Sequence, residues 1–433
     1  MLLSLLTGVL GPLAAAAQDT PGPLTLPALY RAVDSVNPAI HAAQASARAA
    51  AARVPGTRRL PDPRLQLATM NRGLPGFGLQ APLGMNQIQL SQMLPMPGTG
   101  KLSLAGQVAQ SRADAEEAKV SESIWGQRSR AAMAFYDLYR ADATLRVMRE
   151  TLRLLESVSR TVSGMYAVGE ATQADVVRAQ LEIGRMTGQI EEMAAMQLTA
   201  TARLNTVLNR PADSPTGIPQ LPAFPDSLPS ADSLTTLALT SRGMIRAGAE
   251  QLRAATTAER LARREIWPDL EVAVIYGQQP MGGGGTDRML SLMLGATVPI
   301  WAGSRQLRMR DEAAAMRQMA QADLDAMRAD TRGRVAELVA ELERARRLRA
   351  LYERTVLPEA EATVAAARAA YQVGRVNFMT FLDAIMTVNG YRVEIHRLEA
   401  EEGQILAELE MLTATPLVAA TIEAGATTPG GAR

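Results

Sequence analysis

A short motif occurs twice in this chain, each time at the end of a long helical stretch. Tyr166-Ala167-Val168-Gly169 returns 205 positions later as Tyr371-Gln372-Val373-Gly374. Three further landmarks recur at offsets of 204 to 207: Pro61-Asp62 at Pro268-Asp269, Leu94-Pro95 at Val298-Pro299, and Ile40 at Ile245. A nearly constant offset indicates a duplicated unit of about 200 residues, and a repeat of that size determines the whole fold.

Both repeats follow one predicted order: helix, strand, loop, strand, long helix, tight turn, helix. Alternating hydrophobicity predicts strands at about 64–70, 86–93, 270–276 and 288–298. The predicted helices include two long ones at 102–166 and 304–371, the second containing Pro358, and a continuous one at 231–265. A helix of about 65 residues spans about 100 Å, which suits a hollow cylinder of antiparallel helix pairs better than a compact globule.

The predicted domain boundaries follow this duplication. Residues 1–17 form an apolar stretch that ends in an A-x-A pattern, which is typical of a signal peptide; a short membrane anchor is the alternative. The remaining segments are the first repeat at 18–212, a proline-rich linker or equatorial segment at 213–230, the second repeat at 231–414, and a flexible C-terminal tail at 415–433.

The composition excludes several classes of function. The chain has no cysteine, which rules out disulfides, thiolate metal sites, a cysteine nucleophile and lipid attachment through an N-terminal cysteine. A formal net charge of +1 gives no reason to expect a nucleic-acid partner. His41 and His396 have no cluster of metal ligands near them in the sequence, and both are predicted on helix surfaces. We therefore expect no enzymatic activity, no metal site and no cofactor.

The turn after each Tyr-x-Val-Gly motif carries the signals of two helix ends that meet. Gly169 and Gly374 fit the C′ position, where a residue in the left-handed conformation ends a helix. Thr172 and Asn377 follow three positions later and are good N-caps for the next helix. Thr172 with Asp175 also resembles a capping box, although Glu or Gln is the usual partner. Both turns are therefore predicted as tips of helical hairpins.

The strands have the pattern of a membrane barrel. In the last one, Leu290, Leu292 and Leu294 alternate with Ser291 and Gly295, which is typical of a strand between lipid and a wet lumen. Four strands cannot close a barrel, and an open edge in lipid leaves backbone groups unpaired at a cost of several kcal/mol each. Three chains supply about 12 strands, enough for an aqueous channel, whereas about eight from two chains would enclose a filled interior. We therefore predict a homotrimer.

Several short motifs occur in order through both repeats. They are Asn37-Pro38-Ala39-Ile40, Leu60-Pro61-Asp62-Pro63, Gln92-Met93-Leu94-Pro95, Trp267-Pro268-Asp269-Leu270, Val298-Pro299-Ile300-Trp301-Ala302-Gly303 and the two Tyr-x-Val-Gly tips. Together they resemble the outer-membrane efflux protein (TolC-like) family, from about Leu26 to Leu412. The resemblance implies a mainly α fold with a small β part. Long antiparallel coiled-coil hairpins would form an α-barrel tunnel, and four strands per chain would join a 12-stranded trimeric transmembrane β-barrel.

The resemblance also implies a function, a location and partners. The chain would be a passive outer-membrane channel, the exit duct of a tripartite efflux or type I secretion system. It would lie in the outer membrane of a Gram-negative-type bacterium, in contact with outer-membrane lipid and with a large periplasmic part. Its protein partners would be two further copies in the homotrimer, a periplasmic adaptor (membrane fusion) protein that docks near the hairpin tips, and an inner-membrane pump.

Candidate gate residues follow from the same resemblance. The family gate lies at the hairpin tips, where acidic residues ring the pore and bonds between hairpins hold it shut. Tyr371 and Asp383 match the gate pattern of the second hairpin, and Asp175 supplies an acid in the first. A gate arginine of the family falls on Val376, with Arg375 beside it. The alternatives are a solvated helix position for Asp383 and packing beneath the turn for Tyr371.

Three other interpretations stay open. Methionines cluster around both strand pairs, at Met70, Met85, Met93, Met96, Met281, Met289 and Met293. Thioethers bind soft metals such as Cu(I), so the pattern would suit a copper-type heavy-metal efflux component. Lipid-facing or gap-filling methionine is the alternative. From other classes, a soluble periplasmic adaptor would carry a single hairpin, and a purely structural coiled-coil protein would lack the strands.

Overall fold

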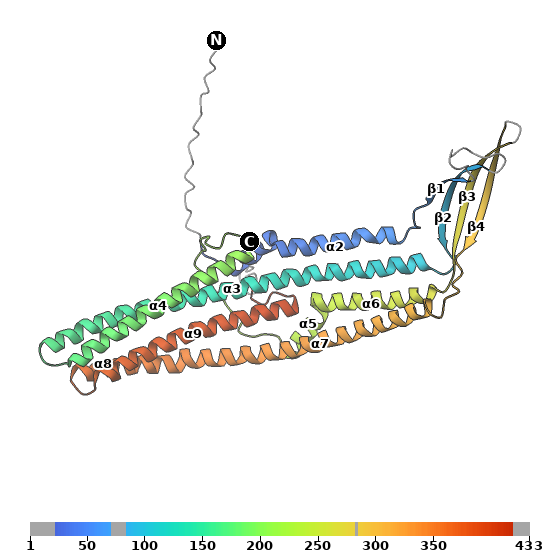
Figure 1. The fold of residues 1–433 in the computed structure, drawn as a ribbon. Coiled ribbons are helices and arrows are strands. Elements are labelled where there is room, and N and C mark those ends of the chain that lie inside the picture. The colour runs from blue at the N-terminus through green and yellow to red at the C-terminus, as the bar shows by residue number, and fades with distance from the viewer. Residues whose placement is uncertain (1–21, 71–83, 282–284, 419–433) are drawn as a thin grey trace, which may run out of the picture. The chain divides into compact units, whose positions relative to one another are not determined.

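The computed structural model describes residues 22–70, 84–281 and 285–418 (Figure 1). The expected signal peptide at 1–17, most of the expected tail and residues 282–284 lie outside these ranges. The chain divides into two compact units. The tip unit takes in residues up to 32 together with 131–223 and 348–403, and the sheet unit takes in 33–130, 224–347 and the residues from 404 onward.

The sheet unit contains a four-stranded antiparallel sheet with the order β1-β2-β3-β4. The strands are β1 (Arg64–Met70), β2 (Met85–Pro95), β3 (Asp269–Pro280) and β4 (Thr286–Ala296). Each repeat supplies one hairpin, and the two hairpins join along β2 and β3, where Leu94 lies opposite Leu270. Backbone hydrogen bonds of a single sheet therefore connect the two repeats.

The leading helix of each repeat is broken at an equivalent place. α1 (Leu26–Val36) and α2 (Pro38–Thr57) meet at Asn37, while α5 (Ala231–Ser241) and α6 (Gly243–Arg264) meet at Arg242. Asn37 and Arg242 lie 205 positions apart, and both are extended, with ψ of 120° and 124°. The expectation of a continuous helix at 231–265 is therefore wrong.

A side chain from another helix explains the second break. Glu122 lies on α3 (Lys101–Ala167), and its Oε2 accepts the backbone N–H of Met244 at 3.0 Å, so it caps the first turn of α6. Its Oε1 pairs with the Arg242 guanidinium at 3.2 Å. A Cβ on Gly243 would lie 2.6 Å from the Ala118 carbonyl oxygen, so only glycine allows this close approach.

The tip unit consists of two helical hairpins that share a core. The last part of α3 and α4 (Gln173–Val207) form one hairpin, and α8 (Leu357–Gln372) and most of α9 (Phe378–Thr413) form the other (Figure 1). One buried cluster contains residues of all four helices, among them Val162, Met186, Ala367 and Leu382. Apolar packing between the hairpins therefore supplies the core of this unit.

The second long helix is interrupted, contrary to the expectation of one helix at 304–371. α7 (Gln306–Leu351) passes into a π-helical turn at Tyr352–Val356, after which α8 begins. Pro358 lies directly beyond this turn, and a proline has no N–H to donate and crowds the carbonyl four residues earlier. A wider turn ahead of Pro358 accommodates both effects. Apart from these interruptions, the prediction of a mainly helical chain with four antiparallel strands is confirmed.

Candidate functional site: the two-faced sheet and the hairpin tips

One face of the sheet is apolar, and we call it the leucine face. Its members are Leu65, Leu67, Ile88, Leu90, Val272, Val274, Leu290, Leu292 and Leu294. The register sets them side by side, because Leu67 pairs with Ile88 and Val272 pairs with Leu294. Leu67 and Leu294 are each 74% exposed. A continuous exposed apolar surface of this kind marks contact with lipid or with another protein.

The opposite face is polar, and we call it the glutamine face. Its members include Gln66, Gln87, Gln89, Ser91, Glu271 and Ser291. Gln66 pairs with Gln89, and Ser91 pairs with Ala273 at a position where both residues are buried. Leucine outside and glutamine or serine inside is the alternation of a strand that separates lipid from a water-filled lumen.

Five strand methionines lie on the glutamine face: Met70, Met85, Met93, Met289 and Met293. Met70 pairs directly with Met85 across β1 and β2. These side chains therefore do not share the leucine face. Met85 packs over Gly277, where an added Cβ would lie 3.1 Å from its sulfur, so at this position methionine fills a gap in the sheet.

A buried lysine ties the base of the sheet to the helices, and we call this group the base clamp. Lys101 begins α3 and is 7% exposed. Its Nζ donates to the Trp267 carbonyl oxygen at 2.8 Å and to Asp269 Oδ1 at 2.9 Å, and it lies 3.5 Å from Glu265 Oε2. Because a buried ammonium needs charged or hydrogen-bonding partners, these contacts hold the start of α3 against the start of β3.

The two hairpin tips end their helices in the same way. Gly169 and Gly374 have positive φ, at 80° and 70°. Gly169 N–H bonds to the Tyr166 carbonyl oxygen at 3.0 Å, and the N–H of the next residue, Glu170, bonds to Met165 at 2.8 Å. The second tip repeats both bonds between equivalent residues, at 3.0 and 2.9 Å. This pair of bonds is the Schellman motif that glycine at C′ permits.

The helices that follow are capped as the sequence indicates. Thr172 Oγ1 accepts the Asp175 N–H at 3.2 Å, and Asp175 Oδ2 accepts the Thr172 N–H at 3.1 Å, so the capping box is complete. Asn377 Oδ1 accepts the Thr380 N–H at 2.9 Å in the second tip. Each cap supplies a partner for an N–H that a helix start would otherwise leave unpaired.

The candidate gate residues fall into two environments. Tyr371 is 9% exposed and stacks on Phe381, with ring centroids 5.9 Å apart. Burial raises the pKa of Tyr371, and the negative charge of Asp175 raises it further. Asp383 and Arg375 are exposed, and within the described residues no side-chain bond joins either to another group. The structure thus brings Tyr371 and Asp175 together and leaves Asp383 and Arg375 in solvent.

Comparison with solved structures shows a shared fold. VceC from Vibrio cholerae superposes with a TM-score of 0.77 at 16% identity, over 90% of this chain and 96% of that one. The MtrE channel from Neisseria gonorrhoeae gives 0.76 at 17% identity, over 90% and 89%. A membrane protein from Pseudomonas aeruginosa gives 0.77 at 20% identity, over 90% and 93%. No curated protein sequence matches the chain.

A sequence comparison finds a family match in the second repeat. Residues 234–415 match the model of a family described as Outer membrane efflux protein. By sequence, the second repeat of the chain belongs to this family. This efflux protein is therefore a channel of the outer membrane of Gram-negative-type bacteria, with a helical part in the periplasm, and it is not an enzyme. Among the helices of the described residues, none is long and apolar enough to cross a membrane.

The tip unit of the efflux protein also contains a polar network that sequence reasoning missed. Tyr139 donates from α3 to Glu399 Oε2 on α9 at 2.6 Å, and His396 Nδ1 lies 2.8 Å from the same oxygen. Nearby, Arg349 pairs with Glu402, which is 1% exposed. His41 is exposed as predicted, but His396 is partly buried within a network. Glu399 three residues after His396 was the available signal, since such pairs share a helix face.

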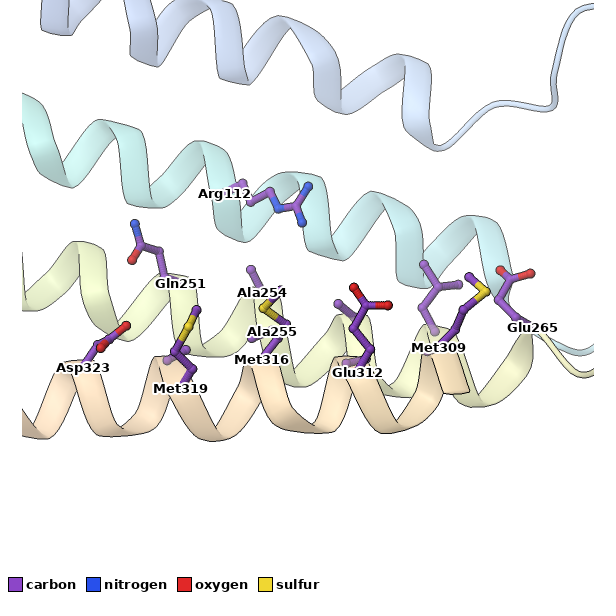
Figure 2. A pocket seen from close by; sticks show the side chains of 15 residues that line it. Arg112, Gln251, Ala254, Ala255, Glu265, Met309, Glu312, Met316, Met319 and Asp323 are labelled. Atoms are coloured by element: carbon purple, nitrogen blue, oxygen red, sulfur yellow. The ribbon is translucent and has the colours of Figure 1, made fainter. Parts of the chain in front are cut away.

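A groove of about 570 Å³ lies between α6 and α7 in the sheet unit (Figure 2). Met309, Met316 and Met319 line it from α7, alanines line it from α6, and Arg112 of α3 lies beside it. Alanine and methionine suit packing more than chemistry. No cluster of three or more histidine or acidic side chains that could hold a metal ion occurs within the described ranges.

Proposed function

We propose that three copies of this efflux protein assemble into one passive exit duct, closing a barrel of about 12 strands. The observation that carries the proposal is a two-faced sheet with open edges. Strands of 7 to 12 residues suit a tilted crossing of a bilayer. β1 and β4 have no neighbouring strand on their outer sides among the described residues, and a membrane tolerates no such edges.

The hairpin tips are the proposed contact for a periplasmic adaptor, which would connect the duct to an inner-membrane pump. Val168 and Val373 support this assignment, because they occupy equivalent positions beside the tip glycines and are 71% and 68% exposed. Exposed apolar side chains on a rigid turn provide contact area at low cost in entropy. The pump then supplies the energy for transport. The duct itself distinguishes little between substrates, whether they come from an efflux system or from a type I secretion system.

The tips are also the proposed gate, with Asp383 and Asp175 as acids of the ring. Asp383 is exposed and so remains hydrated and available to ions. Arg375 lies beside the tip glycine and can pair with an acid of another hairpin, while Tyr371 packs beneath the turn and holds it in place. An acidic ring at a constriction attracts cations and repels anions.

The proposal is tested with purified protein in mild detergent. Light scattering should give the mass of three chains, and planar-bilayer recordings should give cation-preferring pores. Asp383→Ala should lower the cation preference, with Glu359→Ala, an acid on the surface of α8 away from the turn, as the matched control. A monomer that stays folded would overturn the trimer. A trimer whose ion preference is the same in both variants would overturn only the acidic ring.

A second candidate function is the efflux of a soft metal ion. The observation that favours it is the placement of five methionines on the glutamine face, where a permeating ion would meet them. Thioethers bind Cu(I) in preference to hard cations. Replacing Met70 and Met93 with leucine should lower copper tolerance in cells that depend on this channel. Met316→Leu, in the groove of the helical part, is the control and should change nothing.

A further inference from the structure

We propose that the groove between α6 and α7 is a binding site for an amphiphilic cation, a small molecule with an apolar body and a positive charge. The groove lies within the sheet unit, so all of its walls belong to one compact part of the chain. Its volume of about 570 Å³ is within the range of pockets that hold small ligands. The site is formed by a single chain and does not depend on the proposed trimer.

The duplication supplies a second groove for comparison, of about 300 Å³, between α2 and α3. On α2 it is lined by Ser46, Ala49, Ala50 and Arg53, which correspond, 205 positions later, to Gln251, Ala254, Ala255 and Ala258 of the larger groove. On α3 it is lined by Arg112, Ala115 and Glu116, which correspond, 204 positions later, to Met316, Met319 and Ala320. The two grooves are therefore equivalent places in the two repeats.

Exchanges between the repeats make the second groove larger and more apolar. Arg53 corresponds to Ala258, so alanine leaves empty the space that an arginine side chain takes in the first repeat. Arg112 corresponds to Met316, whose flexible thioether adapts to the shape of a neighbour. Met316 and Met319 are 50% and 55% exposed, so this surface is accessible to a ligand. The second groove thus offers an apolar floor of alanine and methionine.

Acidic side chains surround this apolar floor. Asp323 lies at one end of the groove and Glu265 at the other, with Glu312 between them (Figure 2). Arg112 is the one basic residue in the lining. Glu265 is already balanced in part by Lys101, 3.5 Å away. The other two acids are exposed, and no side-chain bond joins either of them to another described residue. Their charge is therefore available to attract a cation into the groove.

The first-repeat groove has the opposite charge. The residue equivalent to Asp323 is Lys119, and Arg53 and Arg112 line the same groove. A lining that is basic and partly filled repels the ligand that an acidic and open one attracts. Cation binding is therefore expected in the second groove alone, and the first groove serves as an internal control.

A third helix beside such a groove does not close it. In the first groove, Gln251 of α6 lines the edge, and about 300 Å³ remains open. In the proposed trimer, α2 of the next copy would lie beside α7 as α6 lies beside α3. Ser46 of that copy would then take the place of Gln251, and serine is the smaller residue. Assembly therefore leaves the second groove accessible.

Dye binding tests the ligand class. The full-length protein in lipid nanodiscs is titrated with rhodamine 6G, a flat apolar cation, and binding is followed by fluorescence anisotropy with protein-free nanodiscs subtracted. Rhodamine 6G should bind saturably. Fluorescein, which has the same ring system but negative charge, should not. Raising the salt concentration should weaken the binding of rhodamine 6G, because the acids of the groove are exposed.

Substitutions separate the shape of the groove from its charge. Ala258→Arg introduces the residue that the first repeat tolerates at the equivalent place, and it should lower the affinity for rhodamine 6G about tenfold. Ala49→Arg, in the first-repeat groove, is the matched control and should leave it unchanged. Glu312→Gln with Asp323→Asn keeps the shape and should lower the affinity about fivefold. Glu341→Gln, an exposed acid of α7 outside the groove, is the control for charge. Circular dichroism checks that each variant is folded.

Cysteine labelling locates the bound dye, because the chain has no cysteine of its own. Met316→Cys should react with N-ethylmaleimide in the assembled protein, and rhodamine 6G should slow the reaction about tenfold while fluorescein does not. Ala49→Cys, in the first-repeat groove, should react at the same rate with and without either dye.

Each result decides one part of the inference. Affinity for rhodamine 6G that Ala258→Arg leaves unchanged would overturn the site. Equal affinity for both dyes would overturn the preference for a cation. A Met316→Cys protein that stays unlabelled without dye would show that another copy covers the groove, which also overturns the site. A monomeric protein whose dye binding is sensitive to Ala258→Arg would overturn the proposed trimer and leave the binding site intact.

Discussion

The two hairpin tips share one turn but differ in what lies beneath it. Gly169 and Gly374 both adopt positive φ, and both turns carry the same pair of backbone hydrogen bonds. Tyr166 of the first tip is nevertheless 49% exposed, whereas Tyr371 of the second is 9% exposed. The turn is determined by its own residues, and burial beneath it is determined by neighbours that the motif does not contain.

Two phenylalanines account for the difference between the tips. Phe378 and Phe381 lie against Tyr371, with ring centroids 5.7 and 5.9 Å away. At the equivalent positions, 205 residues earlier, the first repeat has Gln173 and Val176. Aromatic side chains contribute large buried areas and prefer such ring contacts. The same glycine turn is therefore packed on an aromatic core in the second tip and is followed by a polar capping network in the first.

Removing part of the aromatic core should give the largest difference in local stability between the two tips. Phe381→Ala should lower the free energy of local opening of the second tip by about 3 to 5 kcal/mol, because it leaves a cavity under the turn. The equivalent change Val176→Ala should cost the first tip about 1 kcal/mol, since fewer buried carbons are lost. Hydrogen exchange of the amides in α4, α8 and α9 measures both. Equal losses in the two tips would contradict the proposed difference in packing.

Substituting the glycines should affect both tips equally. Gly169→Ala and Gly374→Ala should each cost about 1 to 2 kcal/mol, because a Cβ is unfavourable at positive φ. Nothing lies within 4 Å of either added Cβ, so the cost is conformational and independent of packing. Gly188→Ala is the control, since it lies within α4 with equal space and should stabilise that helix slightly. A much larger loss in the second tip would show that its turn depends on the core.

Features determined by local chemistry were predictable from the sequence. The tip glycines, the caps at Thr172 and Asn377, and the alternation in the strands each depend on residues close together in the chain. The duplication added more, because a turn recognised once could be placed again 205 positions later. These signals sufficed for the helical hairpins and the four strands.

Features that depend on distant partners were not predictable from the sequence. The break at Arg242 needs Glu122, which lies 120 residues away on α3. Glu402 looks like a solvated residue of a charged pair, yet it is buried against Arg349. At the candidate gate, nothing in the Tyr-x-Val-Gly motif distinguishes the exposed Tyr166 from the buried Tyr371. A single sequence carries no record of which neighbours the fold will supply.

Removing the N-cap side chains should give a smaller difference in stability loss between the two tips. Thr172→Ala removes the hydroxyl that accepts the Asp175 N–H and donates to Asp175 Oδ2, and it should cost the first tip about 1 to 2 kcal/mol. The bond from the backbone N–H of residue 172 to Asp175 Oδ2 remains. Asn377→Ala removes one accepted N–H and should cost the second tip about 1 kcal/mol. Exchange rates of the Asp175 and Thr380 amides measure each loss, because these N–H groups bond to the caps. Serine at either position should restore most of the protection, and failure to do so would assign the loss to packing.

The smallest expected effect concerns the buried Tyr371 hydroxyl, which has no hydrogen-bond partner in the part of the chain that the structure describes. Tyr371 has a folded-state pKa above its usual value near 10, so the folded protein keeps the phenol proton longer than the unfolded chain does. The stability that this provides is present below pH 10 and is lost as the pH rises toward the folded-state pKa. Tyr371→Phe should therefore leave the second tip unchanged or slightly stabilised at pH 7, since the hydroxyl has no partner among the described residues.

Above pH 10, the same variant should lose less protection in α8 and α9 than the unsubstituted protein. Asp175→Asn should reduce this alkaline loss partway, because it removes the neighbouring negative charge while burial remains. Tyr166→Phe in the first tip is the matched control, and it should leave the alkaline response of the second tip unaltered. If Tyr371→Phe instead destabilises the tip at pH 7, the hydroxyl has a partner in the assembled channel, and a second copy or another hairpin must supply it.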